Sequence, residues 1–229
     1  MPRRLQGVVF CLLLVPLCGT AAQSAREWDS EAVVQRLNEA AKHFRTVTAK
    51  LEYTKVTVVV DDKSTQEGEI YFRKNGTILF DILRPEPKKI LFRDHKAKVF
   101  YPKMNQFQEY DLDKHRGLVE LFLLLGFGTT GDDLKKSYLL TLLGETRLDN
   151  RSVLQLELTP KEERSRNQMH KIHLWLDLAS WAPVHQKFFE VGGDHMTTRY
   201  FALRVNVPIP KSKLNLNAPK KAVRVKPRA

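Results

Sequence analysis

Few residues in this chain stand at spacings that serve known chemistry. Gly126, Gly128 and Gly131 match the G-x-G-x-x-G pattern of dinucleotide sites by letter. They follow a helical run rather than a strand, and no alternation of strands and helices surrounds them. We therefore expect a flexible joint between two segments at these glycines, and no cofactor.

The other chemically suggestive residues are His170 and His173. On a strand, residues three apart face opposite sides, so we expect exposed histidines and no metal site. No serine, histidine and acid occur in a recognisable nucleophile context, and no paired carboxylates stand out at strand ends. The sequence predicts no catalytic residue, and we expect a binding protein rather than an enzyme.

The binding surface is indicated by alternating residues between Gly68 and Asp111. A three-residue hairpin loop, Lys74 to Gly76 with Gly76 left-handed, puts five large apolar side chains on one face: Ile70, Phe72, Ile78, Phe80 and Ile82. A two-residue turn at Asn75 and Gly76 would instead place Asp81 beside Ile70. The three-residue loop keeps charge off the apolar face, so we predict that loop.

This apolar face extends into the following strands of an antiparallel meander and needs a cover. A leucine-rich helix, Arg116 to Phe127, supplies a candidate cover over its part Leu118 to Phe127. We predict an apolar ligand cavity with a wall made of Leu51, Ile70, Phe72, Ile78, Phe80, Ile82, Ile90, Phe92 and Phe100, covered by Leu121, Phe122, Leu125 and Phe127. The alternative is that these side chains fill the interior as a closed core.

The beginning of the chain predicts the compartment. Residues 1–22 have Arg3 and Arg4, an apolar run and then small residues, which is typical of a secretory signal peptide cleaved near Ala22. Cys18 raises the alternative of a lipidated protein. Cleavage at Ala22 removes both cysteines, Cys11 and Cys18, so we expect no disulfide and no cysteine-bearing zinc site in the exported protein.

The remaining length suits a single domain, residues 23–219, followed by a basic, flexible tail, residues 220–229. The formal charge of +12 falls by two, to +10, when Arg3 and Arg4 are removed. An exported chain rarely meets nucleic acid, so this charge favours anionic lipid or an acidic partner. Simple solubility is the alternative.

The remaining elements follow from periodicity. Asp29 is a candidate N-cap for an amphipathic helix over Trp28 to Arg45, with Trp28 and Val33 placed for a hydrophobic staple. A strand follows to Val60, with a phase change that indicates a bulge. Prolines interrupt the meander at Arg84 to Pro87. A short helix from Asp132 and five later strands complete the chain, at about 138–144, 152–158, 169–177, 184–191 and 196–205.

The order of these elements resembles the bacterial outer-membrane lipoprotein carrier (LolA) family. Three stretches carry the resemblance: HFRTVTAKLEY, GEIYFRKNGTILFDI and KKILFRDHKAKVFYPKMNQFQEY. The ending RVNVPIPKSKLNLNAP is similar to the closing pattern of the family. Each motif is moderately specific, and their order over nearly all of the chain after residue 22 is the stronger signal.

The resemblance implies an α+β fold: an incomplete antiparallel β-barrel of about 10–11 strands, closed by an N-terminal helix and short lid helices. It further implies a monomeric periplasmic carrier of acylated lipoproteins or other lipid cargo. Cargo would come from an inner-membrane lipoprotein-releasing ABC transporter and pass to an outer-membrane acceptor. Well-known members have arginine followed by proline at the position where this chain has Lys74 and Asn75, with Arg73 just before. The arginine that holds the lid in the family is therefore absent or displaced here, and lysine is not its equivalent.

Three other functions stay open. A LolA-like carrier could serve another lipid or a glycolipid. A second possibility is a sensor of mislocalised lipoproteins that has a related fold and controls a stress protease. Such a sensor has a second domain after the barrel, and we expect this chain to be too short for one. An enzyme acting on lipids is the third.

Overall fold

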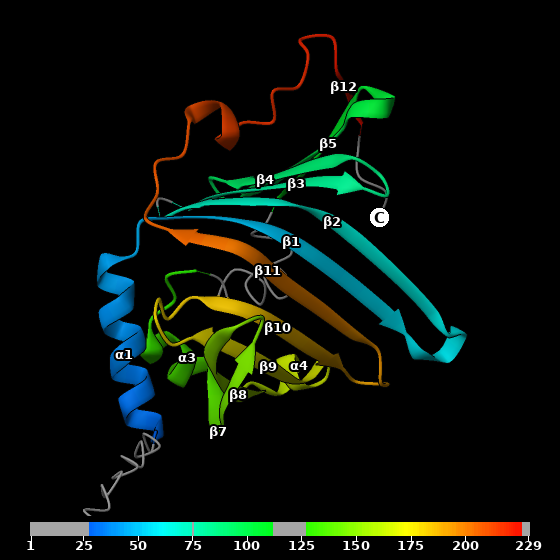
Figure 1. Cartoon of the computed structure of the whole chain (residues 1–229). Helices are drawn as coiled ribbons and strands as arrows, with labels where there is room; N and C mark the ends of the chain where they lie inside the picture. The colour runs from blue at the N-terminus through cyan, green and yellow to red at the C-terminus, as the bar shows by residue number, and fades with distance from the viewer. Residues whose placement is uncertain (1–27, 75, 112–126, 226–229) are drawn as a thin grey trace, which may run out of the picture.

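The computed structural model describes residues 28–74, 76–111 and 127–225. Its main feature is one sheet of twelve strands in the order β12-β6-β5-β4-β3-β2-β1-β11-β10-β9-β8-β7 (Figure 1). The strands are β1 (Thr46–Thr57), β2 (Asp62–Arg73), β3 (Thr77–Arg84), β4 (Lys88–Arg93), β5 (Lys96–Tyr101), β6 (Gln106–Asp111), β7 (Tyr138–Leu148), β8 (Arg151–Pro160), β9 (Met169–Asp177), β10 (Pro183–Glu190), β11 (His195–Val205) and β12 (Val223–Val225).

The short elements lie between or beside these strands. They are the α-helices α1 (Ser30–His43), α3 (Gly131–Ser137) and α4 (Glu163–Arg166), and the 3-10 turns η1 (Val58–Val60), η2 (Pro102–Met104) and η4 (Lys211–Leu214). Within the described ranges, no helix combines the length and the apolar character needed to cross a membrane.

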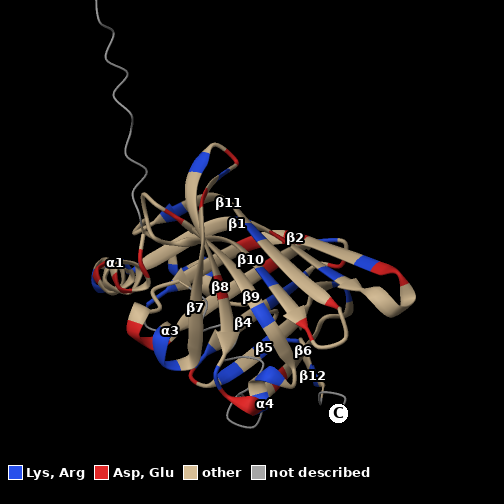
Figure 2. Cartoon of the chain, turned by 90° about the horizontal axis from the view of Figure 1, so that it is seen from below, with Lys and Arg blue, Asp and Glu red and all other residues tan. Residues whose placement is uncertain are grey.

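Helix α1 confirms the predicted N-terminal helix, with slightly shorter bounds. The Asp29 side chain accepts a 2.7 Å hydrogen bond from the backbone N–H of Ala32, as expected of an N-cap. Val33 and Leu37 point from one side of the helix into the core, together with Leu134 of α3. Both views place α3 beside α1 (Figures 1 and 2). The two helices therefore pack together on the sheet.

The predicted register of the β2–β3 hairpin is confirmed. Arg73 pairs with Thr77 and Ile70 pairs with Phe80, so three residues separate the strands. Gly76 has φ +84°, a left-handed value that favours glycine. Asp81 lies opposite Glu69 rather than beside Ile70, so charge stays off the apolar face.

The first strand departs from its predicted length. A bulge is present against β11, between Thr48 and Lys50, which is earlier than the predicted phase change. The strand ends at Thr57, and Val58–Val60 form an exposed 3-10 turn instead of continuing it. The three valines therefore belong to a loop and not to a strand face.

The pairing registers divide the sheet into two faces. The inner face is the one on which α1 and α3 pack, and it carries Leu156, Leu174, Gln186, Thr198 and Tyr53 in one row across β8, β9, β10, β11 and β1. The outer face carries the alternate residues. Leu154, Leu156 and Leu158 of β8 are fully buried against α1 and α3. This half of the sheet is therefore filled by protein side chains.

The end of the described chain differs from the predicted flexible tail. Val223–Val225 form β12, which pairs in parallel with β6, and Arg224 makes a 3.2 Å ion pair with Glu109. Before it, Ile209 and Leu214 pack on Tyr71, Leu79 and Leu91 of the outer face. The prediction of a flexible tail relied on the basic composition and overlooked the alternation of Val223, Arg224 and Val225, which form an edge strand. The part of the prediction at 226–229 lies outside the described residues.

The predicted α+β class and the incomplete barrel agree with this open sheet, in which β7 and β12 are the two ends among the described strands. The sheet has twelve strands rather than 10–11. The predicted signal peptide and the predicted helix up to residue 126 lie outside the described residues, and of that helix only Phe127 can be placed.

Candidate functional site: the apolar inner face

The candidate site is the inner face of β1 to β5. Val47, Phe72, Ile78, Phe92 and Ala97 lie in one row across five strands. The next row consists of Ala49, Ile70, Phe80, Ile90 and Val99. Period-two alternation in each strand, held in register by hairpins, produces this continuous apolar surface.

Eight of the nine predicted wall residues lie together on this face. They are Leu51, Ile70, Phe72, Ile78, Phe80, Ile82, Ile90 and Phe92. Leu51 joins the group because it pairs with Gly68, which pairs in turn with Ile82. Of the predicted cover residues, Leu121, Phe122 and Leu125 lie outside the described residues.

The placement of Phe100 on this face is wrong. Phe100 pairs with Lys89, and Lys89 pairs with Asp81, so all three lie on the outer face. A two-residue connection at Asp94 and His95, both with positive φ, sets this register. Val99 takes the inner position that Phe100 was expected to hold. Phe100 is buried on the outer face, opposite Phe107.

Phe127, the one described residue of the predicted cover, does lie against the apolar face. Its ring is parallel to that of Phe44, with centroids 6.1 Å apart, and meets the edge of Tyr200 at 5.1 Å. Phe72 lies 6.1 Å from Phe127 and 5.6 Å from Phe44. Four aromatic rings from α1's end, β2, the chain before α3, and β11 thus meet at one end of the inner face.

The two halves of the inner face are filled differently. Under α1 and α3 the core residues are almost completely buried. On β2 to β5, Phe72, Phe80, Ile90, Phe92 and Val99 are only half-buried. Ile70, Ile78, Ile82 and Ala97 on the same face are buried. The closed-core alternative therefore describes the β7–β11 half, whereas the β2–β5 half combines buried aliphatic side chains with half-buried aromatic rings.

The two rows described above are apolar, and the row beyond them contains Lys88 of β4, which pairs with Ile82. The cluster around Phe44, Ile70 and Phe127 brings buried aromatic and aliphatic side chains together. Burial raises the pKa of the Tyr200 hydroxyl above its usual range. Apolar side chains of this kind can pack against a hydrocarbon chain.

The structure shows where Arg73 and Lys74 lie, the two residues at or next to the position of the family's lid-locking arginine. Arg73 points to the outer face, where its Nη2 donates to the Ile209 carbonyl at 3.3 Å. Lys74 takes a different role, because its Nζ donates to the Ala41 carbonyl in the last turn of α1 at 2.7 Å. Lys74 therefore fastens the helix end to the β2–β3 hairpin.

The glycines and histidines that were weighed as chemical motifs lie in positions set by backbone conformation and packing. Gly128 has φ +82°, and a Cβ on Gly131 would overlap the Val34 backbone of α1. His170 is exposed as predicted. His173 is not, because it lies half-buried between Trp175 and Phe189, with Nε2 2.9 Å from the Glu157 carboxylate.

Several residues of the inner face were missed by the sequence analysis. Val47, Ala49 and Tyr53 share the phase of Leu51, so the alternation of the first strand contained the signal. Tyr200 and Val205 belong to β11, which is far from β1 in the sequence and becomes its neighbour when the sheet forms. No local sequence signal indicates that neighbour.

Several solved structures resemble this protein in fold. An uncharacterized conserved protein from Thermus thermophilus superposes with a TM-score of 0.57 and 13% identity, covering 87% of this chain and 100% of that one. MucB superposes with a TM-score of 0.54 and 16% identity, covering 87% of this chain and 66% of that one. A LolA superfamily protein from Nitrosomonas europaea matches with a TM-score of 0.39 and 15% identity, covering 80% and 97%.

No protein-family model and no curated protein matches the sequence. The solved structures that match include a member of the LolA superfamily, which the sequence resembles. At 13–16% identity, the likeness to the Thermus protein and to MucB shows a common fold and nothing finer. The class defined by fold and site is thus an open antiparallel sheet, a fold shared with these two structures, with apolar rows on its inner face.

Proposed function

We propose that the protein is a carrier that binds acyl chains on the inner face of β2 to β5. The observation that carries the proposal is the half-buried group of Phe72, Phe80 and Phe92, from two adjacent rows, next to the enclosed rings of Phe44 and Phe127. Half-buried aromatic rings gain contact area when a hydrocarbon chain packs on them.

The energetic case for a carrier follows from the cargo. At about 0.8 kcal/mol per buried CH₂, a chain of roughly sixteen carbons costs on the order of 12 kcal/mol to expose to water. A protein surface that accepts part of the chain offsets this cost and allows transfer between membranes. The proposal requires binding only, so no catalytic residue and no cofactor enters it.

The finer proposal is that the cargo is an acylated lipoprotein moved through the periplasm. An inner-membrane lipoprotein-releasing ABC transporter would supply the cargo, and an outer-membrane acceptor would receive it. The net charge of +12 suits contact with anionic headgroups or acidic partners. Figure 2 shows acidic and basic positions interspersed in that view, which argues against a nucleic-acid stripe.

The first test locates the ligand. A photo-crosslinking residue, p-benzoylphenylalanine, is placed at Phe80 on the inner face or at Phe107 on the outer face, and protein from the periplasm is irradiated. We expect a lipid adduct by mass spectrometry at Phe80 and none at Phe107. Native mass spectrometry that finds no bound lipid under any gentle condition would overturn the proposal.

Depletion of the protein tests the identity of the cargo. If the cargo is a lipoprotein, triacylated lipoproteins accumulate at the inner membrane. If they remain correctly placed while the crosslinked lipid is a glycolipid or another lipid, the protein is a carrier for that molecule. This second candidate uses the same inner face and differs only in the cargo.

One further candidate is a sensor that binds a protein partner, since MucB, which shares the fold, also has a structure in complex with MucA. In that case a bound lipid would change the affinity for the partner instead of being delivered. Transfer of a crosslinkable lipoprotein from the purified protein to outer-membrane vesicles separates the two functions. A carrier delivers the lipoprotein, and a sensor retains it.

A further inference from the structure

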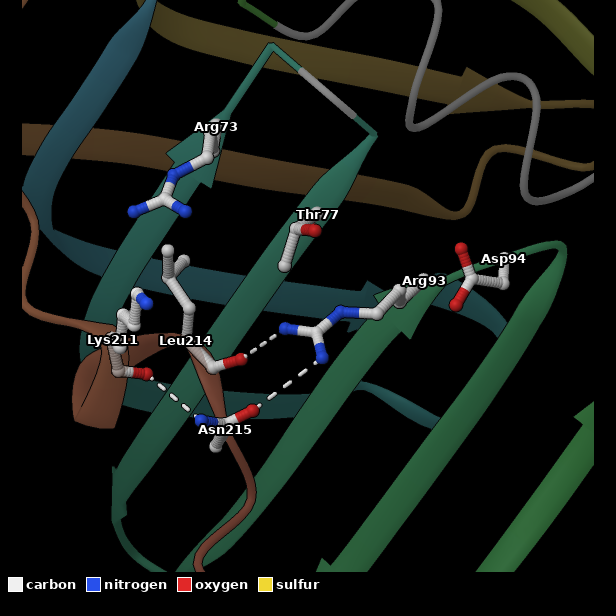
Figure 3. A pocket seen from close by; sticks show the side chains of 7 residues that line it. All are labelled: Arg73, Thr77, Arg93, Asp94, Lys211, Leu214 and Asn215. Atoms are coloured by element: carbon white, nitrogen blue, oxygen red, sulfur yellow. Dashed lines mark hydrogen bonds between the residues drawn. The ribbon is translucent and has the colours of Figure 1, made fainter.

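A cavity lies on the outer face, beside the segment that contains η4. It has a volume of about 360 Å³, within the range of small-molecule sites, and is bounded by the ends of β2 and β4, by Thr77 of β3 and by η4 (Figure 3). Leu214 is almost completely buried where it packs on Leu79 and Leu91, and this contact holds η4 in place. The cavity is on the side of the sheet opposite to the proposed acyl-chain site.

The lining of this cavity is dominated by positive charge. Arg73, Arg93 and Lys211 contribute three cations, against one carboxylate, Asp94. Among the described residues, no carboxylate lies within ion-pair distance of either guanidinium. The positive charges therefore stay largely uncompensated, and both arginines are half-buried, where electrostatic interactions are screened less than at the surface.

Neutral groups fix the two arginines in position. Arg93 donates from Nη2 to the Leu214 carbonyl at 2.6 Å and from Nη1 to Asn215 Oδ1 at 3.4 Å. Asn215 is itself oriented by a 2.9 Å hydrogen bond from Nδ2 to the Lys211 carbonyl. Arg73 donates to the Ile209 carbonyl at 3.3 Å. Carbonyl acceptors orient a guanidinium without cancelling its charge, and each guanidinium has five N–H donors, so donors remain for a ligand.

We propose that this cavity binds a phosphate group. Two guanidinium groups held by neutral oxygen atoms, with a lysine at the rim, supply the kind of N–H donors that a phosphate oxyanion accepts in pairs. The volume also leaves room for the group attached to the phosphate. That phosphate can belong to a soluble phosphate compound or to a lipid headgroup, and the chemistry of recognition is the same.

The test uses the whole purified protein and three single substitutions of equal charge change. Arg73→Gln and Lys211→Gln remove cavity charges, and Lys136→Gln removes an exposed charge on α3. Binding of inorganic phosphate is measured by titration calorimetry. Binding of vesicles is measured by co-sedimentation, with phosphatidylcholine alone or mixed with phosphatidylglycerol.

We expect phosphate-dependent binding that is at least about tenfold weaker in Arg73→Gln and Lys211→Gln and unchanged in Lys136→Gln. Saturable binding of inorganic phosphate assigns the site to soluble compounds. Binding only to vesicles with phosphatidylglycerol assigns it to a headgroup. No binding in either assay, or equal loss in all three variants, would overturn the proposal. Because this site lies on the outer face, the result is independent of acyl-chain binding.

Discussion

Lys74 reaches from the β2–β3 hairpin to the end of α1, where its ammonium group donates a 2.7 Å hydrogen bond to the Ala41 carbonyl. The backbone N–H of Lys74 also donates to the Arg45 carbonyl at 2.8 Å. The last carbonyls of a helix have no partner within the helix and carry partial negative charge. A cation from a neighbouring hairpin satisfies this end and joins α1 to the sheet.

Replacement of this ammonium group tests the connection. Lys74→Met keeps the length of the side chain and removes the donor, so we expect the free energy of unfolding to fall by about 1 kcal/mol. Urea denaturation measures the change. Lys50→Met, at an exposed position of β1, is the matched control and should be nearly neutral. Equal effects at both positions would mean that the bond to Ala41 contributes nothing.

The contact between α1 and α3 depends on a missing side chain at Gly131. A Cβ at this position would overlap the backbone of Val34, so Gly131→Ala must push the helices apart. We expect a loss of about 1–3 kcal/mol in unfolding free energy, as for other overpacked interiors. Lys136→Ala, an exposed change in the same helix, should leave stability unchanged or slightly raised. Thermal unfolding of the two variants decides whether the close approach exists.

The sequence predicts the apolar face well where strand alternation and turn chemistry agree. Between β2 and β3, Gly76 and the alternating large residues specify the same register, and the structure has it. Between β4 and β5 the turn residues are Asp94 and His95, which are weaker turn signals than a pair with glycine. The size of Phe100 then misled the assignment, although its phase also contains Lys96 and Lys98.

Long-range pairing is what a single sequence conceals. β11 contributes Tyr200 to the inner face only because it pairs with β1, more than a hundred residues earlier in the chain. Similarly, Val223–Val225 become a strand only because β6 offers an edge and Glu109 offers a partner for Arg224. Neither neighbour leaves a local pattern, so hydrophobic periodicity cannot reveal these contacts.

A half-buried histidine, His185, makes stability depend on pH. His185 stacks on Trp175 with centroids 4.3 Å apart, and within the described residues neither ring nitrogen has a hydrogen-bond partner. Burial, and then the nearby Arg199, lower the pKa of His185 from 6.5 to about 4. The unfolded chain therefore takes up this proton between pH 6.5 and 4 whereas the folded chain does not, so folding loses stability as pH falls through this window.

We expect this histidine to account for about 1–2 kcal/mol of lost stability between pH 6.5 and 4, a figure reduced because the ring is partly exposed. His185→Phe keeps a ring on Trp175 and removes the titration, so its stability should vary less over this range. His170→Phe, at an exposed position, is the control and should retain the slope of the unchanged protein. Urea unfolding at a series of pH values gives the comparison, and an unchanged slope in His185→Phe would contradict the assignment.

The proposed acyl-chain site predicts that two faces of one sheet respond differently to the same substitution. Phe80 and Phe92 meet edge to face on the inner face, with centroids 6.0 Å apart, whereas Phe107 lies on the outer face. All three rings are half-buried, so their replacement by serine should cost similar amounts of stability.

The affinity for a ligand should differ between the variants on the two faces. Loss of one ring in contact with an acyl chain removes apolar contact, and we expect about tenfold weaker binding of a fluorescent fatty acid in Phe80→Ser and Phe92→Ser. In Phe107→Ser the affinity should stay within experimental error of the unchanged protein. If all three variants bind the fatty acid equally well, the chain does not lie on the inner face, because the face of the sheet is what distinguishes these matched phenylalanines.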